Sequence, residues 1–277
     1  MTRITIDPVT RLEGHGKIEI LLDDKGDVEH TYFQIPELRG FESFCVGRPV
    51  EDMPALTNRI CGVCPEAHHM AAAKAADAVY GVTPPRAGRM LRELLYNAFY
   101  VTDHATHFYV LSGPDLIMGP DAPKAERNIL GVVKKVGAEV GGKVIEARKA
   151  GHRVIEIIGG RRIHPCTGVP GGMTKAISDE ERDEIKGLAD YMVEFAAFSL
   201  DLFDSMLADE AIEEIVKGDL YTHETYYAGL VDENDKVTYY DGQIRVVAPD
   251  GEVMGKYEPK DYRDWISEKV EPWTFLK

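Results

Sequence analysis

The sequence contains no long apolar run. No segment approaches the roughly 20 consecutive apolar residues that a membrane-spanning helix requires. Residues 1–8 also lack the apolar core of a secretory signal peptide. We therefore expect a cytoplasmic protein with no membrane span.

Cysteine and positive charge are also scarce. Four cysteines in 277 residues, two of them close together, suit a reducing compartment better than a disulfide framework. The 32 Lys and Arg residues against 47 Asp and Glu residues give a net charge of −15, and this field opposes contact with nucleic acid or an anionic membrane. The hydrophobic content of 44% is typical of a globular protein, and the length permits one large domain or two small ones.

A compact group of metal-binding side chains lies within the segment Arg59–His69. Cys61 and Cys64 are three positions apart, and His68 follows the second cysteine by four. Two thiolates and an imidazole at this spacing can hold a transition metal. We expect the charge of Arg59 to favour the thiolates and Gly62 to let the backbone aim both sulfurs at one point.

Two ordinary interpretations compete for this group. A structural zinc site normally needs a second Cys/His pair, but Cys45 and Cys166 stand alone. A thioredoxin-like redox pair should open a helix in a βαβ unit, and the sequence pattern predicts no such unit.

The hydrophobic periodicity predicts strands at both ends of the chain and helices between them. Strands are expected within residues 3–35, around a turn at Asp23–Gly26. Further strands are expected at residues 227–231, 236–240, 243–248 and 252–257. The expected helices begin near Glu37 and include Met53–Ile60, a segment through Met70 to Tyr80, Arg86–Leu111, Asp121–Gly151, a helix opened by the capping box at Ser178, and Asp261–Val270.

Several polar residues interrupt these patterns. Glu13 fits a solvated turn, and Glu42 fits a surface position next to an apolar helix face. Asp103 and His107 are one helical turn apart, which is typical of an internal salt bridge that orients a buried helix. The stretch Gly159–Gly172 is too rich in glycine and proline for a regular element.

These motifs together resemble the large subunits of [NiFe] hydrogenases. The R-x-C-G-x-C-x-x-x-H pattern and the upstream run Arg39–Glu42 are similar to the N-terminal signature of that family. So are the D-P-x-T-R-x-E-G-H run at Asp7–His15 and the D-H-x-x-H-F run at Asp103–Phe108. The H-P-x-x-x-x-P-G-G loop at His164–Gly172 resembles the cytoplasmic, multi-subunit branches, and the resemblance covers essentially the whole chain.

The resemblance implies a role for individual residues. Cys61 would be a terminal nickel ligand, and Cys64 would bridge nickel to an iron that carries CO and cyanide. His68 would hydrogen-bond to this centre, Glu13 would pass protons to and from it, and Glu42 would help to bind Mg²⁺ beside it.

The remaining polar residues and thiols are not expected to bind the metals directly. Asp103 would lie just outside the metal ligands, and His107 is a less favoured candidate for the same surroundings. Cys45 and Cys166 are expected to be packed thiols rather than ligands, and the family offers no role for His69.

The resemblance also implies a fold and an activity. The fold would be α+β and mostly α, with a long-helix bundle, a small N-terminal β element and a β-meander near the C-terminal end. The activity would be heterolytic oxidation of H₂. Its electrons would pass to a small subunit with iron–sulfur clusters, then to NAD(P)-, flavin- or ferredoxin-linked partners.

One family motif, D-P-C-x-x-C-x-x-H, is absent from the 277 residues. We therefore expect residues 1–277 to form a single large-subunit-like domain that is incomplete at its C-terminus. Two rivals remain, namely a zinc-stabilised interaction domain and a metal-free scaffold subunit of a respiratory-type NADH dehydrogenase. Members of the latter group have lost the cysteines, whereas this chain keeps Cys61 and Cys64.

Overall fold

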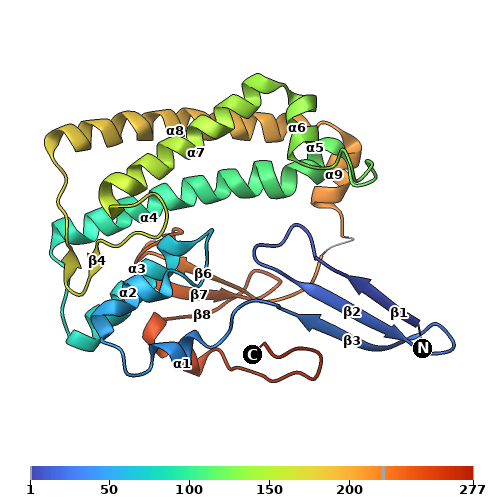
Figure 1. Cartoon of the computed structure of the whole chain (residues 1–277), viewed down its shortest axis with the longest axis horizontal. Helices are drawn as coiled ribbons and strands as arrows, with labels where there is room; N and C mark the ends of the chain where they lie inside the picture. Colours follow the sequence, from blue (N-terminus) through green and yellow to red (C-terminus); the bar gives the residue numbers. More distant parts are fainter. Residues whose placement is uncertain (1, 220–221, 277) are drawn as a thin grey trace. The chain divides into compact units, whose positions relative to one another are not determined.

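The computed structural model describes residues 2–219 and 222–276 (Figure 1). The chain divides into two compact units, one made of Met1–Gly40 with Glu224–Lys277 and the other of Phe41–His223. The expectation of a single domain stays a prediction. No helix in the described ranges is both long enough and apolar enough to cross a bilayer.

The first sheet of the smaller unit contains β1 (Thr2–Ile6), β2 (Lys17–Leu22) and β3 (Val28–Gln34) in antiparallel order β1-β2-β3. The turn between β2 and β3 forms because the Asp23 carboxylate accepts the backbone N–H groups of Lys25 and Asp27 at 2.8 and 2.9 Å. The sequence-based prediction of this hairpin is confirmed.

The second sheet of this unit contains β6 (Tyr227–Val231), β7 (Gln243–Val247) and β8 (Val253–Tyr257), paired antiparallel in that order. The expected strand at residues 236–240 is wrong, since within it Val237 forms only an isolated bridge to Val231. The carboxylate of Asp232 accepts two backbone N–H groups of the following residues and closes a tight loop there. This loop leaves too little extended chain for a fourth strand.

The expected helix Asp261–Val270 is also wrong. A 3₁₀ helix covers Pro259–Asp264, and residues 266–270 are irregular. The indole of Trp265 stacks on the ring of Tyr257 with 5.1 Å between ring centroids, and it lies over Gly255. We infer that this packing against β8 ends the helix.

The larger unit is built from helices. They are α1 (Phe41–Cys45), α2 (Met53–Thr57), α3 (Pro65–Tyr80), α4 (Arg86–Thr106), α5 (Gly113–Met118), α6 (Ile129–Val136), α7 (Ala138–Gly159), α8 (Asp179–Met206) and α9 (Glu210–Lys217). A 3₁₀ turn at Val50–Asp52, a π-helical turn at His107–Ser112, and the two-residue strands β4 (Gly168–Val169) and β5 (Gly172–Met173) lie between them. The α+β, mostly α fold class is confirmed.

Three long helices, α4, α7 and α8, pack side by side in this unit (Figure 1). Gly151 on α7 allows their close approach, because a Cβ there would lie 2.2 Å from Cγ2 of Thr102 on α4 and 3.4 Å from Sδ of Met192 on α8. One buried apolar cluster joins the same helices through Ala105, Tyr109, Ala147 and Phe195. The core of the unit therefore lies along this helix layer.

The expected helix Asp121–Gly151 is wrong, because it is two helices. Gly137, with φ +93°, separates α6 from α7. The side chain of Asn128 caps α6 by accepting two backbone N–H groups of its first turn. The apolar spacing alone runs through this break, and so it suggests one helix.

The expected helix Arg86–Leu111 ends early as an α-helix. It gives way after Thr106 to the π-helical turn His107–Ser112. Pro114, which has no N–H group, follows directly at the start of α5. A regular α-helical hydrogen-bond ladder cannot continue unchanged through that proline.

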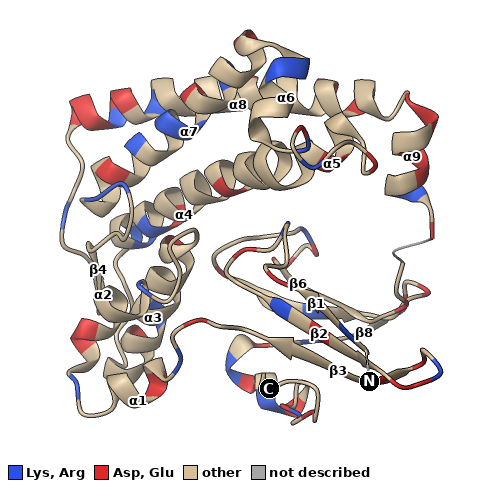
Figure 2. Ribbon diagram, turned by 45° about the vertical axis from the view of Figure 1, so that its right-hand side comes forward, with Lys and Arg blue, Asp and Glu red and all other residues tan. Residues whose placement is uncertain are grey.

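Ser178 begins α8 with the predicted capping box, which the reciprocal Ser178 and Glu181 hydrogen bonds confirm. Figure 2 shows in red the acidic residues in the first turns of α8 and α9, where the helix dipole favours negative charge.

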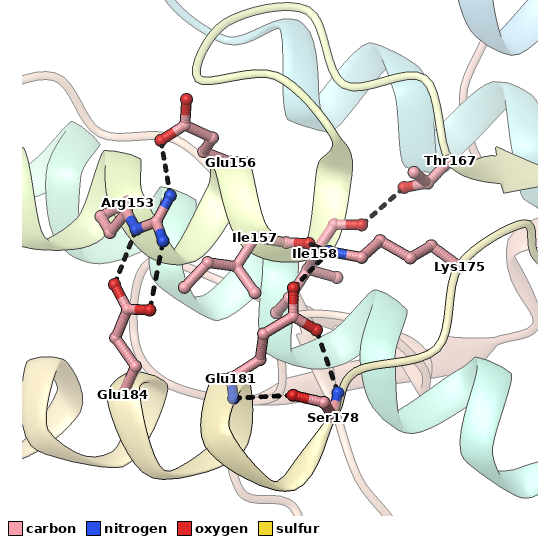
Figure 3. A network of polar contacts seen from close by, with 9 residues as sticks. All are labelled: Arg153, Glu156, Ile157, Ile158, Thr167, Lys175, Ser178, Glu181 and Glu184. Atoms are coloured by element: carbon pink, nitrogen blue, oxygen red, sulfur yellow. Dashed lines mark hydrogen bonds and ion pairs between the residues drawn. The ribbon is translucent and has the colours of Figure 1, made fainter.

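A polar network fixes α7 against the start of α8 (Figure 3). Arg153 on α7 donates two hydrogen bonds to the Glu184 carboxylate of α8, at 2.7 and 3.1 Å, and one to Glu156 at 3.1 Å. These bonds lower the pKa of both carboxyl groups. Lys175 joins the network by donating to Glu181 and to the carbonyl of Ile157.

Candidate metal centre

The candidate metal donors converge at the start of α3. Cys64 is the N-cap residue of this helix and Pro65 follows it, which leaves Cys61 in the preceding loop. The two Sγ atoms are 2.7 Å apart, and the backbone N–H of Cys64 donates to Sγ of Cys61 at 3.1 Å. His68 lies one helical turn after Cys64, and the three donor atoms lie within 4.8 Å of one another.

This donor group has the chemistry of a thiolate metal site. Cys61 is only 8% exposed, and its sulfur accepts the backbone N–H of Cys64. Cys64 is at the N-terminus of α3, and two sulfurs together with an imidazole can bind a transition metal. Among the residues that the structure describes, these three form the one group of at least three His, Cys, Asp or Glu side chains that lie close enough together to hold a metal ion.

The loop before the cysteines forms hydrogen bonds with the distant segment that follows α7. The buried side chain of Asn58 donates to the carbonyl of Pro165 at 2.8 Å, and the backbone carbonyl of Asn58 lies 2.9 Å from Nδ1 of His164. Arg59 donates to the carbonyl of Ala55 and to Oδ1 of Asn58. The glycine-rich stretch after α7 therefore supports the cysteine loop, while the effect of Arg59 on the thiolates stays a prediction.

His69 belongs to the scaffold of the site. It is fully buried, with Nδ1 2.8 Å from the carbonyl of Pro54 and with Nε2 accepting the N–H of Gly168 at 2.9 Å. Burial lowers its pKa, which favours the neutral imidazole. The ring thus joins α2, α3 and β4, a role that the sequence alone did not reveal.

Asp103 of α4 lies beside the cysteine loop. A cavity of about 120 Å³ is lined by Gly62, Val63, Pro65, Glu66, Thr102, Asp103, Thr106, Arg148, His152 and Ile163. Glu66 in its wall is 2% exposed, and burial, with a smaller contribution from Asp103, raises its pKa to about 7. The structure therefore brings a second carboxyl group, which sequence reasoning missed, next to Asp103.

Tyr96 is a further neighbour that the sequence did not single out. Burial raises its pKa, with smaller effects from Tyr100 and from the charges of Cys64 and Asp103. The seven-residue spacing between Tyr96 and Asp103 places both on one face of α4, and this spacing was the available signal.

Other predicted residues are not part of the donor group. Glu13 belongs to the smaller unit, between β1 and β2, and Glu42 is exposed on α1 of the larger unit. His107 is exposed, and its Nδ1 lies 3.4 Å from Oγ of Ser112. The roles of Glu13 and Glu42 stay predictions. The side chain of Asp103 faces the cavity beside the cysteine loop, whereas that of His107 lies next to Ser112.

The remaining thiols differ from one another. All four cysteines lie in the described ranges, and they form no disulfide. Cys45 is half-buried, as a packed residue would be, but Cys166 is exposed, with its Sγ 3.8 Å from the carbonyl of Gly159. The prediction that Cys166 is packed is wrong, because the loop turns its side chain outward.

Comparisons with known proteins relate the helix layer and this donor group to nickel-dependent hydrogenases. Residues 39–137 match the family described as nickel-dependent hydrogenase, and residues 3–38 match a family described as HoxL-like. The chain is similar to nickel-dependent hydrogenases, and it resembles that family's large subunits.

Individual relatives agree with this assignment. An iron-sulfur subunit of the F420-non-reducing hydrogenase of Archaeoglobus profundus is 45% identical, over 100% of this chain and 57% of the relative. A vhu subunit of the F420-non-reducing hydrogenase of Methanocaldococcus jannaschii is 43% identical, over 100% of this chain and 65% of the relative. The crystal structure of an NAD⁺-reducing [NiFe]-hydrogenase in the H₂-reduced state aligns with a TM-score of 0.90 and 36% identity, covering 99% of this chain and 60% of that one.

The chain thus spans 57% and 65% of the length of these two curated relatives. Sequence-based recognition of the family is confirmed.

Proposed function

We propose that this chain is the part of a [NiFe] hydrogenase large subunit that supplies one pair of thiolates to the metal centre. The assembled enzyme would oxidise H₂ reversibly to protons and electrons. The observation that carries this proposal is the convergence of Cys61, Cys64 and His68 within 4.8 Å at the start of α3.

The residues present fit one half of such a centre. Thiolates select soft or borderline metals such as nickel and iron, and two of them need further ligands, which we place outside the 277 residues. Cys61 would be terminal on nickel, Cys64 would bridge to the iron that carries CO and cyanide, and His68 would hydrogen-bond nearby. When bound, the centre supplies the Lewis acidity for heterolytic cleavage of H₂.

The other residues would handle protons and position the site. Glu13 would relay protons between the centre and solvent, and Glu42 would hold Mg²⁺ through its carboxylate. Asp103 would orient polar groups in the cavity beside the cysteine loop. His69 and Asn58 would hold that loop in place through their buried hydrogen bonds.

Electrons would leave through another polypeptide. Besides Cys61 and Cys64, the sequence contains two further cysteines, Cys45 and Cys166. These are fewer than the four that an iron–sulfur cluster usually needs. The partner that we therefore propose is an iron–sulfur small subunit. We propose a cytoplasmic complex with a nicotinamide, flavin or ferredoxin acceptor. The NAD⁺-reducing structural relative supports the nicotinamide choice.

Metal analysis and infrared spectroscopy of the purified complex test the proposal. We expect nickel together with iron, and CO and cyanide bands outside the protein absorption. Cys61→Ser and Cys64→Ser should each abolish the metal and the bands, whereas Cys166→Ser, a change at an exposed thiol, should keep both.

Two outcomes would overturn this function. Zinc alone, bound through the same cysteines, would make the chain a zinc-stabilised interaction domain. A fully assembled complex without any metal would make it a metal-free scaffold, which is the alternative that the retained cysteine pair does not favour.

A further inference from the structure

The cysteine pair at the start of α3 also has the arrangement of a reversible dithiol switch. Both residues are thiols, and Sγ of Cys61 lies 2.7 Å from Sγ of Cys64. A disulfide bond is about 2.05 Å long, so an approach of roughly 0.6 Å would bring the sulfurs to bonding distance. The same two atoms can therefore hold a metal or bond to each other.

The loop between the two sulfurs leaves room for this movement. It contains Gly62, where a Cβ would meet nothing within 4 Å, and Val63, which is 48% exposed. Glycine gives the backbone the freedom to adjust here. Cys64 is the N-cap residue of α3, so the adjustment falls on the loop before the helix. We therefore expect closure of the ring to leave α3 in place.

The two sulfurs differ in their access to solvent. Cys61 is buried, whereas Cys64 is half-buried. A dissolved oxidant therefore meets Cys64 first, and Cys61 lies directly beside it as a resolving thiol. Redox-sensing cysteines are often arranged in this way, with an accessible thiol next to a second one that resolves the adduct.

The surrounding fold is not that of a thioredoxin-like protein. The strands that the structure describes pair antiparallel in all three sheets, so α3 does not belong to a βαβ unit. Any redox behaviour of the pair therefore comes from the local geometry of the cysteine loop.

We propose that Cys61 and Cys64 form a reversible disulfide before metal is bound, and that this bond closes the site to metal. The oxidant would be a small disulfide, RSSR. Cys64 attacks it, forms a mixed disulfide and releases one RSH. Cys61 then attacks the sulfur of Cys64, forms the new S–S bond and releases the second RSH. The two electrons and two protons of the protein thiols thus leave in the two RSH molecules.

Metal and disulfide compete for the same two atoms. A cysteine sulfur binds a metal as the thiolate, and neither sulfur of a disulfide is one. Of the three donors that lie within 4.8 Å of one another, only His68 would remain. An oxidised chain would therefore accept metal only after reduction, and bound metal would protect the pair from oxidation. That the metal is nickel rests on the proposed function, but the disulfide itself does not.

Thiol mapping of the full 277-residue chain tests the bond. The chain is purified with a reductant and a chelator, separated from both, and exposed to oxidised glutathione. Trypsin releases residues 60–74 as one peptide, because no Lys or Arg lies between Arg59 and Lys74. We expect this peptide to become lighter by two hydrogen atoms and to resist alkylation until dithiothreitol reduces it. The double variant Cys45→Ser with Cys166→Ser should behave in the same way.

Single changes in that double variant test the order of the steps. Cys61→Ser should stop at a stable glutathione adduct on Cys64. Cys64→Ser leaves the buried Cys61, which should react at least about tenfold more slowly because exchange depends on access to the thiol. Circular dichroism should show that all of these variants keep their helices.

A titration with nickel alone measures the effect on metal binding. The reduced chain should bind Ni²⁺ with sulfur-to-metal charge-transfer absorption, and the oxidised chain should bind it at least about tenfold more weakly. Nickel added first should in turn slow disulfide formation. A parallel titration with Zn²⁺ separates the effect of oxidation from the choice of metal.

Four results would overturn the inference. They are a glutathione adduct that persists on Cys64 while Cys61 is present, a bond between two chains, a bond from this pair to Cys45 or Cys166, and equal nickel affinity of the reduced and oxidised chains. Any of these in a complex that contains nickel and iron would defeat this inference only. A reversible Cys61–Cys64 disulfide, in a chain whose purified complex holds zinc alone, would defeat the proposed function only.

Discussion

Arg92 on α4 forms a buried, two-pronged ion pair with Asp77 on α3. Nη1 donates to Oδ2 at 2.6 Å and Nη2 to Oδ1 at 3.2 Å, and the Arg92 side chain is fully buried. The same guanidinium donates to the carbonyls of Val169 and Gly172. One side chain thus fixes two helices and the β4–β5 hairpin, which follows the loop that supports the cysteines.

Replacing Arg92 should strongly destabilise the larger unit. Arg92→Met leaves the Asp77 carboxylate without its buried partner, and breaking such a pair costs about 3–5 kcal/mol. The exposed pair of Arg89 and Glu93 on the same helix provides the control, and Arg89→Gln should cost less than about 1 kcal/mol. Urea unfolding measures both, and equal costs would contradict the assignment.

The adjacent histidines His68 and His69 should separate metal binding from folding. His69→Ala leaves the buried Pro54 carbonyl and Gly168 N–H unsatisfied and should cost about 2–4 kcal/mol of unfolding free energy. His68→Ala should change stability by less than about 1 kcal/mol but weaken metal binding. Unfolding and nickel titrations distinguish the two, and the reverse pattern would show that the roles are exchanged.

Two glycines of α7 should respond oppositely to alanine. Gly151→Ala places a Cβ 2.2 Å from Thr102, and this overpacking should destabilise the protein by about 1–3 kcal/mol. A Cβ at Gly142 meets nothing within 4 Å, so Gly142→Ala should stabilise the helix by about 0.5–1 kcal/mol. Thermal unfolding tests both signs, and a stabilising Gly151→Ala would refute the tight helix contact.

The α7–α8 network should make stability depend on acid pH. Arg153 lowers the pKa of Glu156 and Glu184 below the ordinary value of 4.5, so their contribution is complete above that value. It is lost as pH falls through the folded-state pKa values, because the unfolded chain then binds more protons. Arg153→Gln should flatten the fall in unfolding free energy between about pH 5 and pH 2. Lys186→Gln, which removes an exposed pair within α8, should flatten it less.

Glu13 should affect turnover without affecting the metal. In the assembled complex, Glu13→Gln removes the carboxylate that we propose as a proton relay and should slow H₂ oxidation by about 10²-fold or more, with nickel and iron content unchanged. Glu29→Gln, an exposed change on β3 of the same unit, serves as the control. Wild-type turnover of Glu13→Gln would show that the relay assignment is wrong.

The convergence of Cys61, Cys64 and His68 could be predicted from the sequence because it depends on local structure. Cys61, Cys64 and His68 lie within eight positions, and the start of α3 alone brings them together. The environment could not be predicted in the same way. The supports of His69 and the cavity shared by Glu66 and Asp103 depend on contacts between segments far apart in the chain.

The fold was predicted where one signal governs an element. The capping box of Ser178 and the Asp23 turn are such cases, and both are confirmed. Predictions failed where a tertiary contact or a single backbone angle overrides a periodic pattern. Gly137 divides a regular apolar stripe, and the stacking of Trp265 on Tyr257 ends a helical sequence.

The hydrogen bond from Asn58 to Pro165 spans 107 positions of the chain. During synthesis, a nascent chain that has not yet emerged beyond residue 165 cannot close that bond, so the two sulfurs are still carried by an unanchored loop. We therefore expect the cysteine loop to reach its final position only after α7 and the loop behind it have left the ribosome.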